Sequence, residues 1–357
     1  MIRLLCVLAV LAVPAWAQPP AERLARLRHG VNITGWFRYP GSRDPAYLAR
    51  WMSDSAMEDL RRAGFGFVRL AIDPPVADAP GMRDIVVDAV CRLQRHGLAV
   101  LVDAHPTDWH LETSAADRVG LRRFWRAMAS ALRRCDPALT IPEVLNEPVF
   151  PGDPGGWAAL QHAILGDIRS RLPDSTVVLT GNGWGSIDGL LTLQPEADPN
   201  TIYSFHFYDP TELISLASYR PGLDRQALAR LPFPVGDRAA CEATATGDPA
   251  TAGLIRYYCA TGWDRATIVH RIEIASSWAH THRVVLMAGE FGATTALNPA
   301  ARLAWLGAVR QSLDAAGIGW ALWGYDDIMG FAVQRPPGGK PLLDGNVLRV
   351  LGLSRAQ

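Results

Sequence analysis

The chain has 357 residues, of which 49% are hydrophobic and 20% charged, and its formal net charge is zero. This balance gives no support to a nucleic-acid-binding protein or to one that binds anionic membrane surfaces. The length allows two domains of average size, but α/β barrels of more than about 250 residues also fold as one unit.

The first residues have the pattern of an export signal. Arg3 precedes an apolar run at residues 4–13, and Ala15-Trp16-Ala17 follows as a small-residue cleavage pattern. Because the run is too short to span a bilayer, we predict a signal peptide at residues 1–17. An uncleaved anchor is the alternative, whereas Cys6 lies inside the run, which argues against a lipid anchor. We expect a secreted or periplasmic protein without stable membrane association.

Eight β-rich runs recur along the rest of the chain, most of them preceded by a helical pattern. Nearly continuous apolar runs are typical of strands buried on both faces, as in a parallel sheet. The alternation predicts an α/β fold, a single-domain (β/α)8 TIM barrel at residues 18–357. A doubly wound open sheet is the alternative, which is weakened because no G-x-G-x-x-G follows the first run. The runs are Gly30–Ile33, Phe65–Leu70, Leu98–Asp103, Leu139–Glu147, Thr176–Thr180, Thr201–His206, Val284–Ala288 and Ile318–Trp323.

The helix before the second run has recognisable end signals. Ser55 and Glu58 are spaced as a capping box, and Gly64 is placed to end the helix. These signals predict a helix that begins at Ser55.

One interval, residues 211–264, is much longer than the other connections. Long loops in compact domains are usually functional, and this one leaves the carboxyl end of the sixth strand. We therefore expect it to form a wall of the active-site cleft, and an inert surface insertion is the alternative.

Four cysteines remain after signal cleavage, and three pairings are possible. We expect Cys91–Cys135, because both lie on helices predicted to be neighbours, and Cys241–Cys259, because both lie in the long loop. Free buried thiols are the alternative. No cysteine spacing resembles a zinc site.

Polar side chains follow most of the predicted strands, where barrel enzymes place their chemistry. Hydrolysis of a glycosidic bond needs two carboxyl groups, one to protonate the leaving oxygen and one to attack the anomeric carbon or to activate water. Glu147 and Glu290 are the best pair, because each ends an apolar run on opposite sides of the predicted ring. Asp103, Asp209, Asp326 and Asp327 are alternatives.

Two motifs carry a resemblance to a known family. Asn146-Glu147-Pro148 and Gly289-Glu290-Phe291-Gly292 resemble the acid/base and nucleophile signatures of glycoside hydrolase family 5, which holds cellulases and related β-glycanases. The resemblance covers nearly the whole mature chain. Further residues fall where the family pattern places them, namely Arg69, His105, His206, Tyr208 and Trp323.

The resemblance implies a role for each of these residues. Glu147 acts first as general acid and then as base, and Glu290 is the nucleophile, which Arg69 and Tyr208 keep ionised. Asn146 binds the sugar 2-hydroxyl, whereas His105 and His206 bind hydroxyls and support Glu147. Trp323 offers a flat apolar face to the sugar that is cleaved.

Two further tryptophans follow predicted strands. Trp36 comes after the first strand and Trp184 after the fifth, and we predict that both contact the substrate. A place in the core is the alternative for each. No metal and no other cofactor is expected, because this hydrolysis needs none.

We therefore predict a monomeric, secreted, retaining endo-β-glycanase that acts on a β-linked polysaccharide or oligosaccharide. β-1,4-Glucan is the expected substrate, although Ala104 stands where many family cellulases carry a second histidine. A β-mannanase, another β-glucanase or an exo-acting β-glucosidase are alternatives, together with a glycan-binding barrel that has no catalytic activity.

Overall fold

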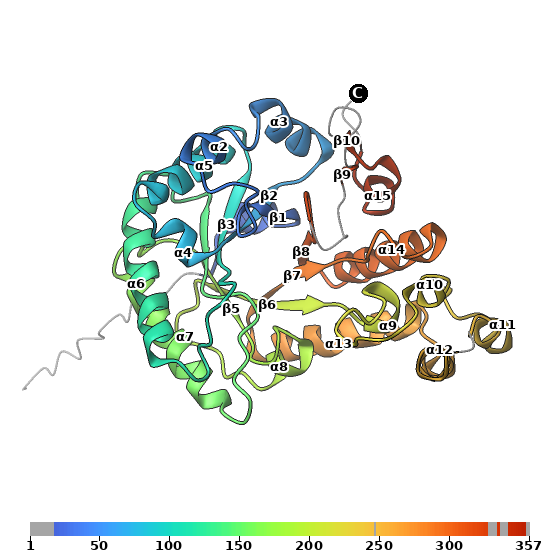
Figure 1. The fold of residues 1–357 in the computed structure, drawn as a ribbon. Helices are drawn as coiled ribbons and strands as arrows, with labels where there is room; N and C mark the ends of the chain where they lie inside the picture. Colours follow the sequence, from blue (N-terminus) through green and yellow to red (C-terminus); the bar gives the residue numbers. More distant parts are fainter. Residues whose placement is uncertain (1–17, 246–247, 328–333, 336–341, 355–357) are drawn as a thin grey trace, which may run out of the picture.

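The computed structural model describes residues 18–245, 248–327, 334–335 and 342–354. The predicted signal peptide lies outside these residues. Eight parallel strands form a closed barrel in the order β1 to β8 and helices surround it, which confirms the predicted TIM barrel (Figure 1). The barrel strands are β1 (His29–Phe37), β2 (Phe67–Ile72), β3 (Ala99–Ala104), β4 (Thr140–Glu143), β5 (Val177–Thr180), β6 (Thr201–Phe207), β7 (Val285–Phe291) and β8 (Gly319–Leu322).

The connecting helices follow the strands in chain order (Figure 1). They are α1 (Ala21–Arg26), α2 (Pro45–Ala49), α3 (Asp54–Ala63), α4 (Pro74–Ala77), α5 (Met82–Arg95), α6 (Ala115–Leu132), α7 (Pro154–Arg169), α8 (Ile187–Leu191), α13 (Arg265–His282), α14 (Pro299–Ala315) and α15 (Gly345–Val350). A short antiparallel pair, β9 (Gln334–Arg335) and β10 (Leu342–Leu343), lies between β8 and α15. Among the described residues, no helix is both long and apolar enough to cross a membrane.

The barrel interior is divided into an apolar layer and a polar layer. Phe67, Leu101 and Ile141 belong to a buried apolar cluster inside the barrel, which Leu27 closes at the amino end. Side chains alternate along a strand, so the residue two positions further points the same way. The next inward positions are Arg69, Asp103 and Glu143, all buried. A charged layer therefore lies directly above the apolar one.

The helix α1 is fixed beneath this apolar layer. Arg23 donates hydrogen bonds to the carbonyls of Pro137, Ala138 and Asp174, close to the amino ends of β4 and β5. The side chain also reaches the hydroxyl of Thr176 at 2.7 Å. These contacts hold α1 against the end of the barrel opposite the strands' carboxyl ends.

The outer helices hold the strand ends through buried tryptophans. The indole of Trp125 on α6 donates to the carbonyl of Val144, and that of Trp157 on α7 donates to the carbonyl of Thr180, both at 2.8 Å. Both rings are fully buried. A buried indole N–H needs an acceptor, and here each acceptor is the backbone at the carboxyl end of a barrel strand.

The residues between β6 and α13 form a helical insertion that contains α9 (Thr211–Ile214), α10 (Arg225–Leu228), α11 (Arg238–Glu242) and α12 (Pro249–Thr261). In Figure 1, α10 to α12 extend away from the barrel beside α13. Cys241 on α11 and Cys259 on α12 form a disulfide, as predicted.

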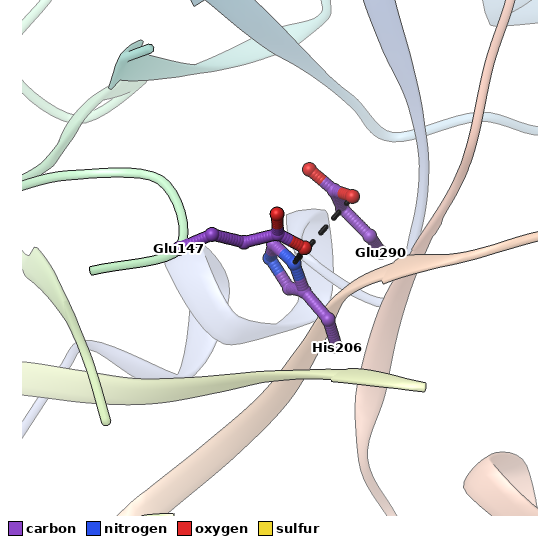
Figure 2. Close-up of side chains that lie close together, drawn as sticks. All are labelled: Glu147, His206 and Glu290. Carbon is purple, nitrogen blue, oxygen red and sulfur yellow. Dashed lines mark hydrogen bonds and ion pairs between the residues drawn. The ribbon is translucent and has the colours of Figure 1, made fainter. Parts of the chain in front are cut away.

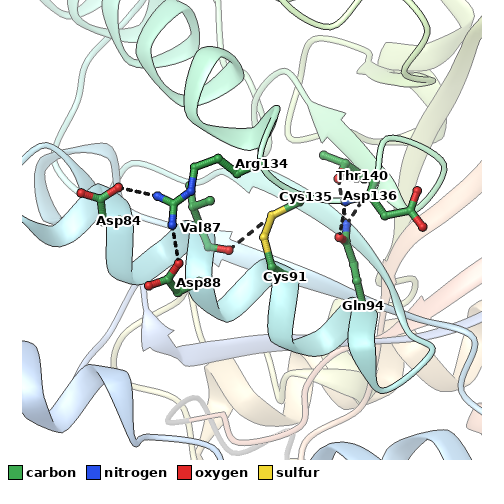
Figure 3. Close-up of a disulfide and its surroundings, with 9 residues drawn as sticks. All are labelled: Asp84, Val87, Asp88, Cys91, Gln94, Arg134, Cys135, Asp136 and Thr140. Carbon is green, nitrogen blue, oxygen red and sulfur yellow. Dashed lines mark hydrogen bonds and ion pairs between the residues drawn. A yellow bond between two sulfur atoms is a disulfide. The ribbon is translucent and has the colours of Figure 1, made fainter.

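The second predicted disulfide, Cys91–Cys135, is also present (Figure 3). It joins α5 to the turn that follows α6. Beside it, Gln94 accepts a hydrogen bond from the backbone N–H of Asp136 and donates one to the hydroxyl of Thr140. The disulfide and these hydrogen bonds together fix the approach to β4.

Several predicted boundaries differ from those of the structure, among them the start of α3 and the end of β4. Helix α3 begins at Asp54 with Ser53 as its cap, because the Ser53 hydroxyl accepts from the N–H of Ala56. Its end at Gly64 is as predicted, with a left-handed φ of 107°. Strand β4 ends at Glu143 and not at Glu147, so all three residues of the first motif, Asn146, Glu147 and Pro148, lie in the loop that follows.

Candidate active site

The two predicted catalytic glutamates line one pocket at the carboxyl end of the barrel, with a volume of about 250 Å³. The pocket brings together six of the predicted site residues: His105, Asn146, Glu147, Tyr208, Glu290 and Trp323. Sequence reasoning did not single out the remaining lining residues, which are Arg38, Tyr39, Thr211, Ile214, Ser215 and Ser218. The last four lie on α9 and just after it, so the insertion forms a wall of this pocket, as predicted.

Glu290 lies near the end of β7 and is almost completely buried, at 3% exposure. Its carboxylate accepts from the guanidinium of Arg69 at 2.5 Å and from the hydroxyl of Tyr208 at 2.8 Å. Burial alone raises the pKa of Glu290, but the positive charges of His206 and Arg69 outweigh it and hold that pKa below its ordinary value. Glu290 is therefore held as an anion, the form that a nucleophile requires.

Glu147 faces Glu290 from the loop after β4 (Figure 2). Its backbone has a φ of 40°, in the left-handed region that side chains other than glycine rarely adopt. The neighbouring Asn146 anchors this turn, since its N–H donates to the carbonyl of Ala104 at 2.9 Å. The Glu147 side chain is 25% exposed, so it is in contact with solvent where Glu290 is not.

His206 lies between the two carboxyl groups (Figure 2). Its Nδ1 is 2.9 Å from Oε1 of Glu147 and 3.4 Å from Oε2 of Glu290. Burial lowers the pKa of His206, but the two carboxylates outweigh this effect and raise it above the ordinary value. Gly289 makes room for the ring, because a Cβ there would lie 3.3 Å from Nε2 of His206 and only 2.4 Å from the Ser204 hydroxyl.

Glu147, His206 and Glu290 lie close together. One carboxylate oxygen of each glutamate and one ring nitrogen of His206 all lie within 4.8 Å of one another. These atom types also bind metals, but two of the three residues already share a hydrogen bond. An oxygen of Glu147 therefore lies within 4.8 Å of one of Glu290. This close approach fits the separation of about 5–5.5 Å between the carboxyl groups of retaining glycosidases better than the wider separation in inverting enzymes.

Arg69 is the centre of a buried ionic cluster. Its guanidinium binds both oxygens of Glu143, at 2.6 and 2.9 Å, and lies 3.1 Å from Asp103, in addition to its contact with Glu290. It also donates to the amide oxygens of Asn32 and Asn146, at 2.9 and 3.0 Å. Because the oxygen of Asn146 is used in this way, its amino group is the part available to donate to a sugar hydroxyl.

Three carboxyl groups thus share one guanidinium. Burial raises the pKa of Asp103 to about 6 and that of Glu143 to about 7, against the opposing charge of Arg69. Sequence reasoning treated Asp103 only as an alternative catalytic acid and missed Glu143. The available signal was a charged residue two positions after Ile141 in an otherwise apolar run, which places it on the inner face of the barrel.

The predicted sugar-binding residues that directly follow β3 and β8 lie close together. Nδ1 of His105 is 2.7 Å from Asp103, and its ring centre lies 6.0 Å from that of Trp323. Burial holds the pKa of His105 well below its ordinary value, and the charges of Arg38 and Arg69 act in the same direction. His105 is therefore a neutral ring near the buried indole of Trp323.

The two other tryptophans predicted to contact the substrate, Trp36 and Trp184, lie in different surroundings from each other. Trp36 is completely buried, donates its indole N–H to the carbonyl of Leu48 and stacks against the rings of Phe37 and Trp51. Its predicted contact with substrate is therefore not supported, because no face of the ring is open. Trp184 is 64% exposed, and its backbone N–H donates to the carbonyl of Pro148 in the Glu147 loop.

Comparison with known proteins gives a consistent result. Residues 29–327 match the family model of Cellulase (glycosyl hydrolase family 5). Endoglucanase 3 of Fibrobacter succinogenes is 25% identical over 334 residues, which cover 84% of this chain and 49% of that protein. Endoglucanase C of Acetivibrio thermocellus is 22% identical over 322 residues, covering 85% and 92%. The chain thus spans about half the length of the first relative, and 30% of Endoglucanase H of A. thermocellus.

Solved structures share the fold. Thermotoga maritima Cel5A in a mutant form with cellobiose superposes with a TM-score of 0.75 at 20% identity, over 94% of this chain and 99% of that one. The same protein with mannotriose gives 0.72 at 21% identity, over 92% and 99%. The cellulose synthase subunit Z of Clostridioides difficile gives 0.72 at 20% identity, over 91% and 99%. At these identities the likeness shows the fold alone.

Proposed function

Since the chain belongs to glycosyl hydrolase family 5, we propose that it is a retaining endo-β-glycanase that cleaves by double displacement. The observation that carries this proposal is the pair of carboxyl groups whose oxygens approach within 4.8 Å in one pocket. The different surroundings of the two groups support the division of roles, with Glu290 as nucleophile and Glu147 as acid/base.

In the first step, the carboxylate of Glu290 attacks the anomeric carbon and Glu147 protonates the departing glycosidic oxygen. An ester forms between the sugar and Glu290, and the leaving-group sugar departs with the proton. The negative charge on Glu290 disappears as the ester forms. Arg69 and Tyr208 orient the attacking oxygens through their hydrogen bonds.

In the second step, the roles reverse. Glu147, now a carboxylate, takes a proton from water, and the resulting hydroxide attacks the anomeric carbon and releases Glu290. Solvent reaches Glu147 but hardly Glu290, which matches these roles. Because the carbon is inverted twice, the product keeps the anomeric configuration of the substrate.

We propose β-1,4-glucan as substrate, since the relatives reported above carry the name endoglucanase. Mannan is the second candidate, because the related T. maritima protein has been solved with mannotriose. Incubation with soluble β-glucan, mannan and xylan, followed by sizing of the products, distinguishes these substrates. A mixture of oligosaccharides supports endo action, whereas monomers or dimers alone refute it in favour of an exo-acting glucosidase.

The catalytic pair is tested by Glu147→Gln and Glu290→Gln. Each change is expected to lower hydrolysis of the polymer by about 10²-fold or more with folding retained. Glu273→Gln, an exposed site on α13, is the matched control. Full activity in either catalytic variant overturns the mechanism. A product with inverted anomeric configuration, measured by NMR, also overturns it. Glycan binding without any hydrolysis by the wild type indicates a glycan-binding barrel without catalytic activity.

We also propose that the protein is exported after cleavage near Ala17 and acts as a monomer in the periplasm or outside the cell. The two disulfides support this location, because such bonds persist in oxidising compartments. Mass spectrometry of the mature protein from culture fractions gives the cleavage site and the compartment. A full-length chain retained in the cytoplasm contradicts the proposal.

A further inference from the structure

We infer that Arg38 forms an anion-binding subsite in the catalytic pocket, which takes the carboxylate of an acidic sugar unit in the glycan. This inference rests on the proposed function and narrows its substrate to β-glucans that carry carboxylate groups. It is carried by the position of the Arg38 guanidinium, by its lack of an acidic partner and by the donor geometry that it presents.

The backbone after β1 brings Arg38 to the pocket. Arg38 and Tyr39 both donate their N–H groups to the carbonyl of Thr34, at 3.3 and 3.0 Å, so the chain turns sharply at the carboxyl end of the barrel. The Arg38 guanidinium then lies over the ring of Tyr39, 4.4 Å from its centre. Both side chains line the pocket that holds Glu147 and Glu290.

The charge of Arg38 has no direct counter-ion. Among the described residues, no carboxylate lies within 4.0 Å of its guanidinium, and its buried Nε has no hydrogen-bond acceptor. The segments outside the described residues contain no aspartate or glutamate side chain. By contrast, Arg69 contacts three carboxylates. The difference indicates that the acceptor for Arg38 is a ligand.

The charge of Arg38 acts on two buried acids, Asp73 and Asp103, and both have other partners. Asp73 accepts the N–H of Thr107 at 3.3 Å, and Asp103 contacts Arg69 and His105. Arg38 acts on both only through its electrostatic field. Neither acid therefore satisfies its donors.

The donor geometry favours a carboxylate over a hydroxyl. A guanidinium has five N–H donors in a flat fork, which fits two coplanar oxygens. A sugar hydroxyl offers a single oxygen, whereas a uronic acid unit offers two oxygens and a negative charge. Charge-assisted pairs of this kind are shorter and stronger than neutral hydrogen bonds, and partial burial of the site reduces their competition with water.

The barrel order shows which part of the substrate meets Arg38. Glu147 follows β4 and protonates the leaving oxygen, so the leaving sugar lies on the β4 side. In the closed ring, β8 lies opposite β4, and β1 is the neighbour of β8. Arg38, which follows β1, therefore faces the part of the glycan that stays bound to Glu290 after the first step.

The test compares two substrates that differ only in charge. One is a soluble β-1,4-glucan, and the other is the same polymer with part of its units oxidised at C6 to glucuronate. For the wild type, kcat/KM is expected to be higher on the oxidised polymer, and added salt should reduce this preference. In Arg38→Gln the ratio of the two values should fall about 10-fold to 100-fold, the usual range for a charge-assisted bond.

Two further variants make the result specific. Arg38→Lys keeps the charge but loses the fork, so its ratio should lie between those of the wild type and Arg38→Gln. Arg43→Gln removes an exposed charge from the same loop, outside the pocket lining, and should keep the wild-type ratio. Far-UV circular dichroism and thermal unfolding of each variant report independently of activity whether it folds.

Three outcomes overturn the inference. The first is a wild type without preference for the oxidised polymer, and the second is an unchanged ratio in Arg38→Gln. The third is an equal loss on both polymers, which makes Arg38 a ligand of neutral hydroxyls. Hydrolysis of the neutral polymer in these cases leaves the proposed function intact. A wild type that cleaves neither polymer nor any other β-glycan overturns the proposed function itself.

Discussion

Glu143 is the buried acid whose removal is expected to change the pH dependence of stability most clearly. Its carboxyl group is completely buried against Arg69, and its pKa is raised from the ordinary 4.5 to about 7. Between these values the folded protein holds a proton that the unfolded chain has released. The contribution of Glu143 to stability is therefore full below about pH 4.5 and is lost as the pH rises through 7.

The size of this effect follows from the two pKa values. A difference of one pKa unit corresponds to about 1.4 kcal/mol, so ionising Glu143 above pH 7 costs the folded state about 3 kcal/mol. Glu143→Gln removes the titrating proton and keeps the shape. At low pH, where Glu143 is protonated, the two side chains resemble each other, and the free energy of unfolding should differ by about 1 kcal/mol or less.

The assay is denaturant unfolding of both proteins at several pH values from 4.5 to 8, with the disulfides intact. The free energy of unfolding of Glu143→Gln minus that of the wild type should rise by about 3 kcal/mol across this range. The exposed Glu273→Gln should show no comparable trend. A difference that stays flat, or that falls with rising pH, refutes the picture of three carboxyl groups crowded around one guanidinium.

Two further predictions concern Tyr208 in the pocket and the exposed Trp184 beside the Glu147 loop. Tyr208→Phe removes a hydrogen bond that lowers the pKa of Glu290, so the pKa of Glu290 should rise. The acidic limb of the pH profile of kcat/KM should then move up by about one to two pH units. An unmoved limb contradicts the assignment of Glu290 as the ionised nucleophile. Trp184→Ala should raise KM for long oligosaccharides about 2-fold to 10-fold, because the stacking of a sugar on the exposed ring is lost. The free energy of unfolding should stay within about 0.5 kcal/mol of the wild type. Equal KM values of the variant and the wild type for long substrates rule out a sugar contact at this ring.

The barrel and the placement of its polar residues were predictable because strand patterns are local. Arg69, His206, Glu290 and Trp323 each follow or end a run whose apolar residues are nearly continuous, and parallel strands must end on one face. The structure accordingly brings these residues together at the carboxyl end of the barrel: Glu290 and Trp323 line the pocket, and Arg69 and His206 contact Glu290. The pairing of Cys91 with Cys135 followed in the same way from neighbouring helices.

Other features depend on contacts that no local pattern contains. The role of Glu143 requires Arg69, which lies 74 positions earlier in the chain. Trp36 is buried because α2 supplies the acceptor carbonyl of Leu48 and the loop after it supplies the stacking ring of Trp51. That Arg38 has no carboxylate partner can be recognised only from the three-dimensional positions of the surrounding acids.

Backbone conformation explains the wrong boundaries predicted for α3 and β4. Ser53 and Ser55 are both plausible caps by residue type, and the extended conformation of Ser53 decides between them. Glu147 was assigned to a strand because the run before it is apolar. Its left-handed φ ends any strand there, and the turn directs its carboxyl group toward His206 and Glu290.

The clamp that Arg23 makes at the base of the barrel has a practical meaning for handling the protein. Because α1 is held near the amino ends of β4 and β5, the chain enters the fold on the side remote from the pocket. A tag, a solid support or a second domain joined ahead of α1 is thus carried behind the barrel. A long polymer then has unhindered access to Glu147 and Glu290 while the protein is tethered.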